Sequence, residues 1–132
     1  MVNYPEKETY TYEDLVHILR ILRAPGGCPW DREQTHESNR RNFLEEAYEA
    51  AEAFDLDDPE LMKEELGDVL FAAVKVGRFC GVDPEAALTK TCEKFITRFR
   101  RVEEAVTARG QEMDEVPLDE LTALWNAAKR PQ

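Results

Sequence analysis

The sequence has 132 residues, 42% of them hydrophobic, which suffices for one compact domain and is short for two. Its formal net charge of -11 argues against a nucleic-acid partner, because proteins that bind the phosphate backbone carry surplus Lys and Arg. No segment has the apolar length of a membrane span, and three cysteines without a CxxC pair fit neither a disulfide framework nor a thiolate zinc site. These features favour a cytoplasmic protein that binds neither nucleic acid nor membranes.

Helix signals follow one another along the chain and predict an all-α fold. After an N-terminal extension (1–10), the cap residue Thr11 precedes a helical apolar pattern that ends before Ala24-Pro25-Gly26-Gly27. Residues 26–38 contain Pro, Gly and Trp without periodicity and are interpreted as a long loop, a kind of segment that is often functional. A second helix is predicted over residues 38–54.

The second half of the chain is also predicted to be helical. Asp58-Pro59 and Asp83-Pro84 each place a capping carboxylate before a proline, which predicts the starts of the third and fourth helices. Residues 111–132 are predicted to form an acidic linker and a short helix, Leu118 to Lys129. Apolar residues of the fourth helix repeat with steps of four and three, as in a bundle seam: Leu88, Cys92, Phe95, Phe99, Val102 and Val106. We therefore expect one four-helix bundle-like domain over residues 1–132 with a short extra C-terminal helix.

Carboxylates lie on or beside the apolar faces of the second and third helices. Glu46 and Glu49 lie at the edge of the second helix's apolar face, and Glu65 and Asp68 interrupt an apolar stripe on the third. Carboxylates in such surroundings are costly to keep charged, so we expect a cation among them. Oxygen-only ligands favour Mg²⁺, with Mn²⁺ as a substitute, over zinc or copper. The face of the second helix predicted to be buried comprises Phe43, Ala47, Ala50 and Phe54.

A magnesium site is favoured over two alternatives for these carboxylates. They would be ordinary helix charges if they paired with cations such as Arg40 or Lys63, but a second pair on an otherwise apolar stripe favours a metal site. A di-iron carboxylate bundle requires Glu-x-x-His on two helices, and His17 and His36 are not placed in that way.

Candidate substrate-binding residues occur on the fourth helix and in the long loop. Lys94, Arg98 and Arg101 form a basic row beside the apolar seam. Such a row would neutralise phosphate charge near a metal site, or alternatively pair with neighbouring acids such as Glu103 and Glu104. Trp30 either stacks on a nucleobase or closes the bundle end as a hydrophobic lid.

Three sequence blocks occur in a specific order. They are the loop GCPWDREQTH (27–36) and the segments LEEAYE (44–49) and EELGD (64–68). The fourth-helix pattern from Lys94 to Glu103 and the tail around Leu121 to Lys129 follow them. From about Leu15 onward this combination resembles the MazG-like nucleoside triphosphate pyrophosphohydrolases, relatives of the dimeric dUTPases. Asn39 departs from the pattern, because such sequences commonly have an apolar residue there.

The resemblance implies the site and the assembly. It implies Mg²⁺ binding by Glu46, Glu49, Glu65 and Asp68, phosphate contacts from Lys94 and Arg98, and a second ion or a water at Glu45. It also implies a homodimer or a higher homo-oligomer, which suits a short bundle that needs more apolar burial.

The expected reaction is Mg²⁺-dependent hydrolysis of nucleoside triphosphates, ribo or deoxy, to the monophosphate and pyrophosphate, as in nucleotide-pool house-cleaning. Glu45 or Glu49 is expected to orient the attacking water. Two alternatives stay open: a non-catalytic helical interaction module that retains the fold, and a nucleotide-specific hydrolase similar to the dUTPases. Neither the base nor the sugar is specified by the sequence.

Overall fold

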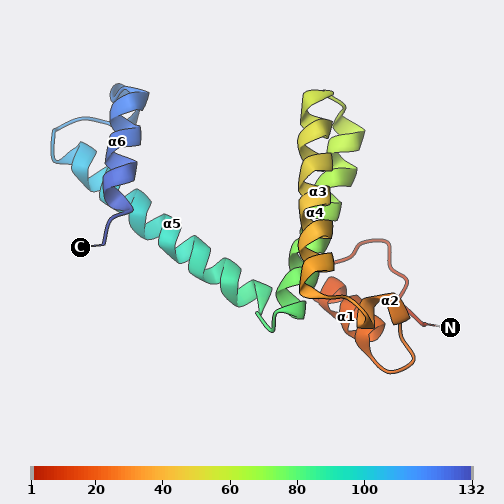
Figure 1. The fold of residues 1–132 in the computed structure, drawn as a ribbon. Helices are drawn as coiled ribbons and strands as arrows, with labels where there is room; N and C mark the ends of the chain where they lie inside the picture. Colours follow the sequence, from red (N-terminus) through yellow and green to blue (C-terminus); the bar gives the residue numbers. More distant parts are fainter. Residues whose placement is uncertain (1, 132) are drawn as a thin grey trace. The chain divides into compact units, whose positions relative to one another are not determined.

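The computed structural model of the chain describes residues 2–131, and every regular element among them is a helix (Figure 1). The all-α fold predicted from the sequence is confirmed. The elements are α1 (Tyr12–Arg23), α2 (Pro29–Arg32), α3 (His36–Asp55), α4 (Pro59–Phe79), α5 (Pro84–Thr107), the 3₁₀ helix η1 (Met113–Glu115) and α6 (Leu118–Ala128). Each helix within residues 2–131 is too short or too polar to span a bilayer.

Local hydrogen bonds explain where the first helices begin. The Thr11 side chain accepts a hydrogen bond from the Asp14 N–H, and the Asp14 carboxylate accepts one from the Thr11 N–H, which forms a capping box for α1. Thr35 and Ser38 form the same arrangement before α3. Asp58 caps α4 by accepting from two backbone N–H groups of its first turn.

The structure corrects two predicted helix boundaries and adds two short helices. The segment interpreted as a loop contains the single-turn helix α2, which Pro29 starts at the first helical position, and α3 begins two residues earlier than predicted because of the Thr35 cap. The predicted linker contains η1. Helix α6 ends at Ala128, so Lys129 is its C-cap residue.

The chain divides into two compact units, Met1–Pro84 and Glu85–Gln132. In the first unit, α3 and α4 form an antiparallel hairpin, and α1 packs on α4 and α2 (Figure 1). The hairpin is packed through small side chains, with Ala53 of α3 and Ala72 of α4 fully or almost fully buried. The expectation of a single domain over residues 1–132 stays a prediction.

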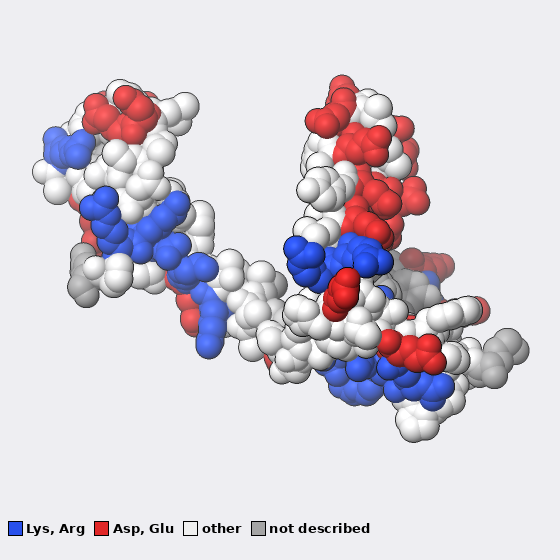
Figure 2. Space-filling view, viewed as in Figure 1, with Lys and Arg blue, Asp and Glu red and all other residues white. Residues whose placement is uncertain are grey.

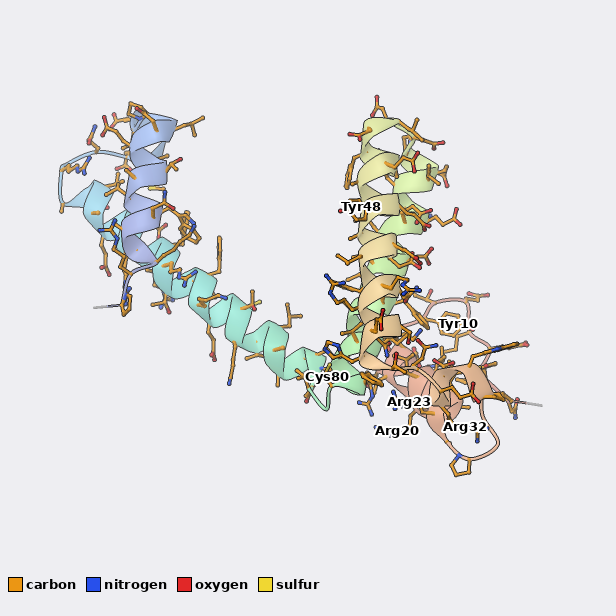
Figure 3. The ribbon with its side chains drawn as sticks, in the orientation of Figure 1. Tyr10, Arg20, Arg23, Arg32, Tyr48 and Cys80 are labelled. Carbon is orange, nitrogen blue, oxygen red and sulfur yellow. The ribbon has the colours of Figure 1, made fainter. Side chains whose placement is uncertain are left out.

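Contacts at the end of α1 complete the first unit. Leu19 is buried, and the guanidinium carbon of Arg23 lies 5.4 Å from the centre of the Phe79 ring of α4. Figure 3 shows Arg20 and Arg23 in this region, close to α2. The N-terminal extension is fastened to α1 by an ion pair between Lys7 and the buried carboxylate of Asp14.

In the second unit, α6 lies against the C-terminal part of α5. Val102, Val106 and Ala128 are buried there, and the Trp125 ring lies 5.5 Å from the Phe95 ring between their centroids. An ion pair of 3.2 Å joins Arg109 at the end of α5 to Glu120 of α6. The second unit is therefore held by apolar packing and by at least one ion pair.

The apolar faces predicted from periodicity are only partly buried within the units. On α3, Ala50 is buried as predicted, but Phe43, Ala47 and Phe54 are exposed. Helix α3 approaches α4 along its small residues Ala50 and Ala53, so the larger side chains beside them are not covered within the unit. The predicted seam of α5 is likewise buried only at Val102 and Val106, where α6 packs, and is exposed at Leu88, Cys92, Phe95 and Phe99.

Candidate metal centre

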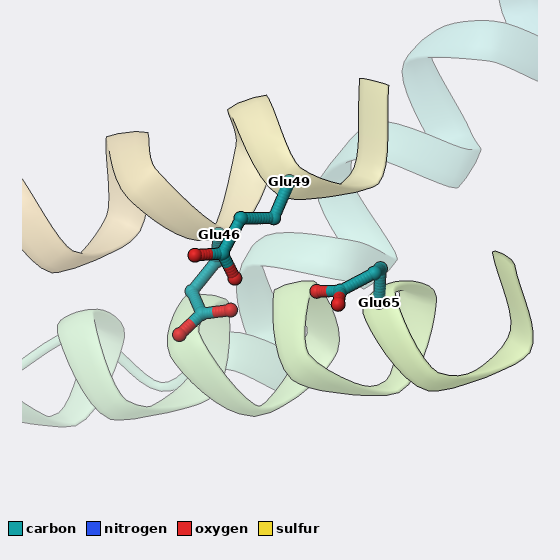
Figure 4. Close-up of side chains that lie close together, drawn as sticks. All are labelled: Glu46, Glu49 and Glu65. Atoms are coloured by element: carbon teal, nitrogen blue, oxygen red, sulfur yellow. The ribbon is translucent and has the colours of Figure 1, made fainter. Parts of the chain in front are cut away.

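Three carboxylates from two helices meet inside the α3–α4 hairpin. Glu46 and Glu49 project from α3, and Glu65 projects from α4 toward them (Figure 4). One oxygen of each carboxylate lies within 4.8 Å of an oxygen of the other two. Glu46 and Glu65 are half-buried, while Glu49 is exposed. The hairpin thus brings one oxygen of each of three carboxylates close together, as a cation site requires.

A second group of carboxylates overlaps with the first. Glu64, Glu65 and Asp68 of α4 also have carboxylate oxygens within 4.8 Å of one another, so Glu65 belongs to both groups. Asp68 is close enough to Glu46 for its charge to raise the pKa of that carboxyl. Glu64 was not among the predicted ligands. Its signal in the sequence is the i, i+4 spacing to Asp68, which puts both side chains on one edge of α4.

Two carboxylate oxygens of the first group have unusual surroundings. Glu46 Oε2 and Glu65 Oε2 are buried, and neither receives a hydrogen bond from the part of the chain that the structure describes. Burial, followed by the charges of Glu49 and Asp68, raises the pKa of both carboxyls. Buried oxygens without a donor, beside other carboxylates, fit the ligand set of a hard divalent cation.

The amide of Asn42 contacts the cluster from the preceding turn of α3. Its Nδ2 donates a hydrogen bond of 3.4 Å to Glu46 Oε1, and this contact opposes the rise in the pKa of Glu46. Glu45, predicted to hold a second ion or a water, is exposed, and its charge also raises the pKa of Glu46.

Trp30, the candidate for stacking on a base, lies on α2 with 78% of its surface exposed. It therefore does not close the end of its unit as a hydrophobic lid. Its backbone oxygen accepts a hydrogen bond of 3.1 Å from Gln34 Nε2, which fixes the backbone of α2 and leaves the indole free.

The predicted basic row lines a cleft in the second unit. Lys94, Arg98 and Arg101 of α5 border a cleft of about 360 Å³ together with Lys129 and Arg130, which follow α6 (Figure 2). Arg101 Nη1 donates to the backbone oxygen of Ala128 at 3.2 Å, which joins the two sides of the cleft. Sequence reasoning missed Lys129 and Arg130, although two consecutive cations at a helix end were a visible signal.

Glu93 is the acid that lines the same cleft, and the acids expected to pair with the row lie elsewhere on α5. No ion pair found in residues 2–131 joins Arg98 or Arg101 to Glu103 or Glu104, the alternative pairing expected from the sequence. A row of cations without such partners is suited to an anionic ligand.

The fold and the candidate site define a class of protein: all-α, with a cluster of carboxylates on a helical hairpin. Residues 34–103, just over half of the chain, match the MazG nucleotide pyrophosphohydrolase domain. The chain belongs to this family.

Several curated proteins are similar to the chain. A nucleoside triphosphate pyrophosphohydrolase/pyrophosphatase MazG from Thermotoga maritima is 54% identical over 63 residues, which are 48% of this chain and 25% of the relative. A nucleoside triphosphate pyrophosphohydrolase from Escherichia coli K12 is 45% identical over 85 residues, which are 64% of this chain and 32% of the relative. The chain therefore spans between a quarter and a third of the length of these two relatives.

A solved structure supports the fold independently. The crystal structure of a mazG-related protein from Thermotoga maritima superposes with a TM-score of 0.65 at 29% identity, covering 90% of this chain and 99% of that chain.

Proposed function

We propose that the chain hydrolyses nucleoside triphosphates to the monophosphate and pyrophosphate with a divalent cation, Mg²⁺, bound by Glu46, Glu49, Glu65 and Asp68. The observation that carries this proposal is the pair of buried carboxylate oxygens without a donor, Glu46 Oε2 and Glu65 Oε2. Family membership and the names of the relatives support a nucleoside triphosphate as the substrate.

The bound cation would join the carboxylates to phosphate oxygens and offset the charge of the transition state. Glu46 and Glu65, half-buried between the helices, serve as fixed ligands. Glu49 or Glu45, both exposed, orients a water and accepts its proton. The water oxygen bonds to the α-phosphorus, the bond from that phosphorus to the α,β-bridging oxygen breaks, and pyrophosphate leaves with the electron pair.

The remaining predicted residues act on the substrate in this proposal. Lys94, Arg98 and Arg101 neutralise phosphate oxygens, and the exposed indole of Trp30 stacks on the base. We further propose a homo-oligomer, because Phe95 and other large apolar side chains are exposed within the units. The free cysteines fit a reducing compartment, so we propose the cytoplasm.

Product analysis tests the reaction. Each of a panel of nucleoside triphosphates is incubated with the purified chain, with and without Mg²⁺, and the products are separated by anion-exchange chromatography. We expect monophosphate and pyrophosphate only when Mg²⁺ is present. Diphosphate with orthophosphate would contradict the proposed bond cleavage, and the lack of hydrolysis of any nucleotide would favour a non-catalytic interaction module.

A matched pair of variants tests the site. Glu65→Gln removes a charge that belongs to both carboxylate groups, and we expect it to lower kcat by about a hundred-fold or more. Glu60→Gln makes the same change on an exposed residue of the first turn of α4, and we expect it to keep activity within about two-fold of the unchanged chain. Full activity of Glu65→Gln would show that Glu65 is not a ligand of the cation.

The same panel tests a house-cleaning role. In this role the chain would remove unwanted nucleotides, so kcat/KM should be higher for modified deoxynucleoside triphosphates than for the standard four. A single strong preference for deoxyuridine triphosphate would instead indicate a hydrolase similar to the dUTPases.

A further inference from the structure

Asn42 is the polar neighbour of the carboxylate cluster to which the proposed function gives no role. It lies four residues before Glu46 on α3, and its half-buried side chain donates from Nδ2 to Glu46 Oε1 at 3.4 Å. The other oxygen of the same carboxylate, Oε2, is buried and accepts no hydrogen bond within residues 2–131. The two oxygens of Glu46 therefore differ in their surroundings: Oε1 accepts a hydrogen bond from an amide, and Oε2 has no donor.

The chemistry of the amide suits this place. A Lys or Arg at position 42 would also donate to Glu46, but its positive charge would compete with a cation for the carboxylate. The Asn side chain donates without adding charge, so it orients the carboxylate and leaves the negative charge in place. Glutamate has several rotatable bonds, and a donor that restricts them reduces the entropy lost when a cation binds.

We propose that Asn42 is a positioning residue that holds Glu46 in the orientation in which Oε2 is free to bind the divalent cation. This inference rests on the proposed function in one respect, namely that Glu46 is a cation ligand. No corresponding side-chain donor to Glu49 or Glu65 is found among residues 2–131, so Glu46 is the ligand that an amide orients.

A purely structural role for Asn42 predicts a different result. An i, i+4 hydrogen bond between side chains stabilises a helix by about 0.2–0.5 kcal/mol and does not change cation affinity beyond that effect. Cation affinity measured on the metal-free protein therefore separates the two roles.

The test measures Mn²⁺ binding to the metal-free 132-residue chain by isothermal titration calorimetry, with free Mn²⁺ followed by electron paramagnetic resonance. Asn42→Ala removes the donor and keeps a strong helix former, and Asn42→Gln restores an amide on a longer side chain. Arg41→Ala is the control, because Arg41 is the exposed neighbour and its ion pair is with Glu37. Circular dichroism and Tm in the presence of EDTA confirm that each variant is folded.

We expect Asn42→Ala to raise the Mn²⁺ dissociation constant about ten-fold, the usual loss of affinity when a partner of a metal ligand is removed. Asn42→Gln should recover at least part of this loss, and Arg41→Ala should change the constant less than about two-fold. The Mg²⁺ concentration for half-maximal activity should rise in parallel, while kcat at saturating Mg²⁺ stays within about two-fold.

Two results overturn the inference, and they are distinguishable. If the unchanged chain binds Mn²⁺ and Asn42→Ala binds it equally well, Asn42 is only a helix residue and the proposed function stands. If the unchanged chain does not bind Mn²⁺, the role of Asn42 and the proposed metal site are both wrong.

Discussion

Asn39 shows how a single polar residue fits into the interior of the first unit. Only 2% of its surface is exposed, and its Oδ1 accepts no hydrogen bond in the described part of the chain. Its Nδ2 donates to the backbone oxygen of Thr35 at 2.9 Å, an oxygen that also accepts from the Asn39 N–H at 3.0 Å. The amide oxygen is thus buried without compensation, at the position where an apolar residue was expected.

We predict that Asn39→Leu raises the free energy of unfolding by about 1 kcal/mol, because it removes an unpaired buried oxygen and adds apolar burial. The Thr35 oxygen keeps its backbone donor, so the change creates no new unpaired group. Urea denaturation followed by circular dichroism measures the effect, with the exposed Asn126→Leu as the control. A loss of stability in Asn39→Leu would show that Oδ1 has a partner after all.

The proposed metal ligands Glu46 and Glu65 give a prediction about pH. Burial and the charge of Glu49 raise the pKa values of Glu46 and Glu65 above their ordinary value of 4.5. The folded chain therefore binds protons more readily than the unfolded chain at these carboxyls. Their contribution to stability is fully present below pH 4.5 and is lost as the pH rises through the raised values.

We expect Glu65→Gln to raise the Tm of the metal-free chain at neutral pH. The Tm of the unchanged chain should rise as the pH falls from about 7 to about 5, and this rise should be smaller in the variant. Free Mg²⁺ at a hundred times Kd should stabilise the unchanged chain by about 2.7 kcal/mol and stabilise the variant much less. Differential scanning fluorimetry across the pH range, with and without Mg²⁺, measures both effects. Equal stabilisation of the two proteins by Mg²⁺ would contradict the ligand role of Glu65.

At the scale of elements, the close turn after α1 depends on Gly27. A Cβ at this position would lie 2.4 Å from the Leu22 oxygen and 2.5 Å from the Ile21 oxygen, both in the backbone of α1. The turn is held by hydrogen bonds from Gly27 N to Ala24 O at 2.9 Å and from Cys28 N to Leu22 O at 2.8 Å. A side chain here would therefore force the backbone apart.

Gly27→Ala is predicted to lower the free energy of unfolding by about 1–3 kcal/mol, because backbone atoms must move to accommodate the methyl group. Gly67→Ala is the matched control on α4, where an added Cβ would contact nothing within 4 Å. That variant should be more stable by roughly 0.5–1 kcal/mol, since Ala favours the helix. Thermal unfolding of both variants measures the contrast, and a neutral Gly27→Ala would show that the turn is adaptable.

Helix starts were predictable where the chemistry is local. Pro59 and Pro84 begin α4 and α5 as predicted, because the proline ring fixes φ at the first helical position. The single-turn helix α2 was missed because four residues are too few to show a periodicity. The packing of α3 was predicted only in part, since periodicity gives the direction of a side chain but not the size of the partner helix's side chains.

The candidate site was predictable to a similar extent. The spacing of Glu46 and Glu49 and the following hairpin suffice to predict that they meet Glu65. The grouping of Glu64 with Asp68 was missed although their i, i+4 spacing indicated it, whereas the hydrogen bond from Asn42 depends on the orientation of one side chain and was not predictable. Lys129 and Arg130 reach the basic cleft only because α6 packs back on α5, a tertiary contact that the spacing does not encode.

For the molecule as a whole, the distribution of charge matters more than its sum. The formal net charge is -11, yet the cleft of the second unit gathers Lys94, Arg98, Arg101, Lys129 and Arg130 (Figure 2). An acidic protein repels a triphosphate at long range, so in the proposed function the cations of this cleft, together with the bound divalent ion, offset that repulsion locally.

We therefore predict that KM for the triphosphate rises with salt, by several-fold between about 0.05 M and about 0.5 M NaCl at saturating Mg²⁺. Arg98→Ala should raise KM at low salt and make its dependence on salt weaker, because one screened contact is lost. Steady-state kinetics at several NaCl concentrations measure both slopes. Identical slopes for the variant and the unchanged chain would exclude Arg98 from phosphate binding.

The carboxylates of the hairpin have a further consequence for how the chain reaches its folded state. The carboxylates of the two groups all lie between residues 46 and 68, on two helices joined by a short connection, and contacts of such short sequence separation form early. We expect their repulsion to slow the docking of α3 on α4 in a newly synthesised chain. A divalent ion that binds at this stage would offset the repulsion and speed the docking of the two helices, so the ion concentration would set how fast the hairpin forms.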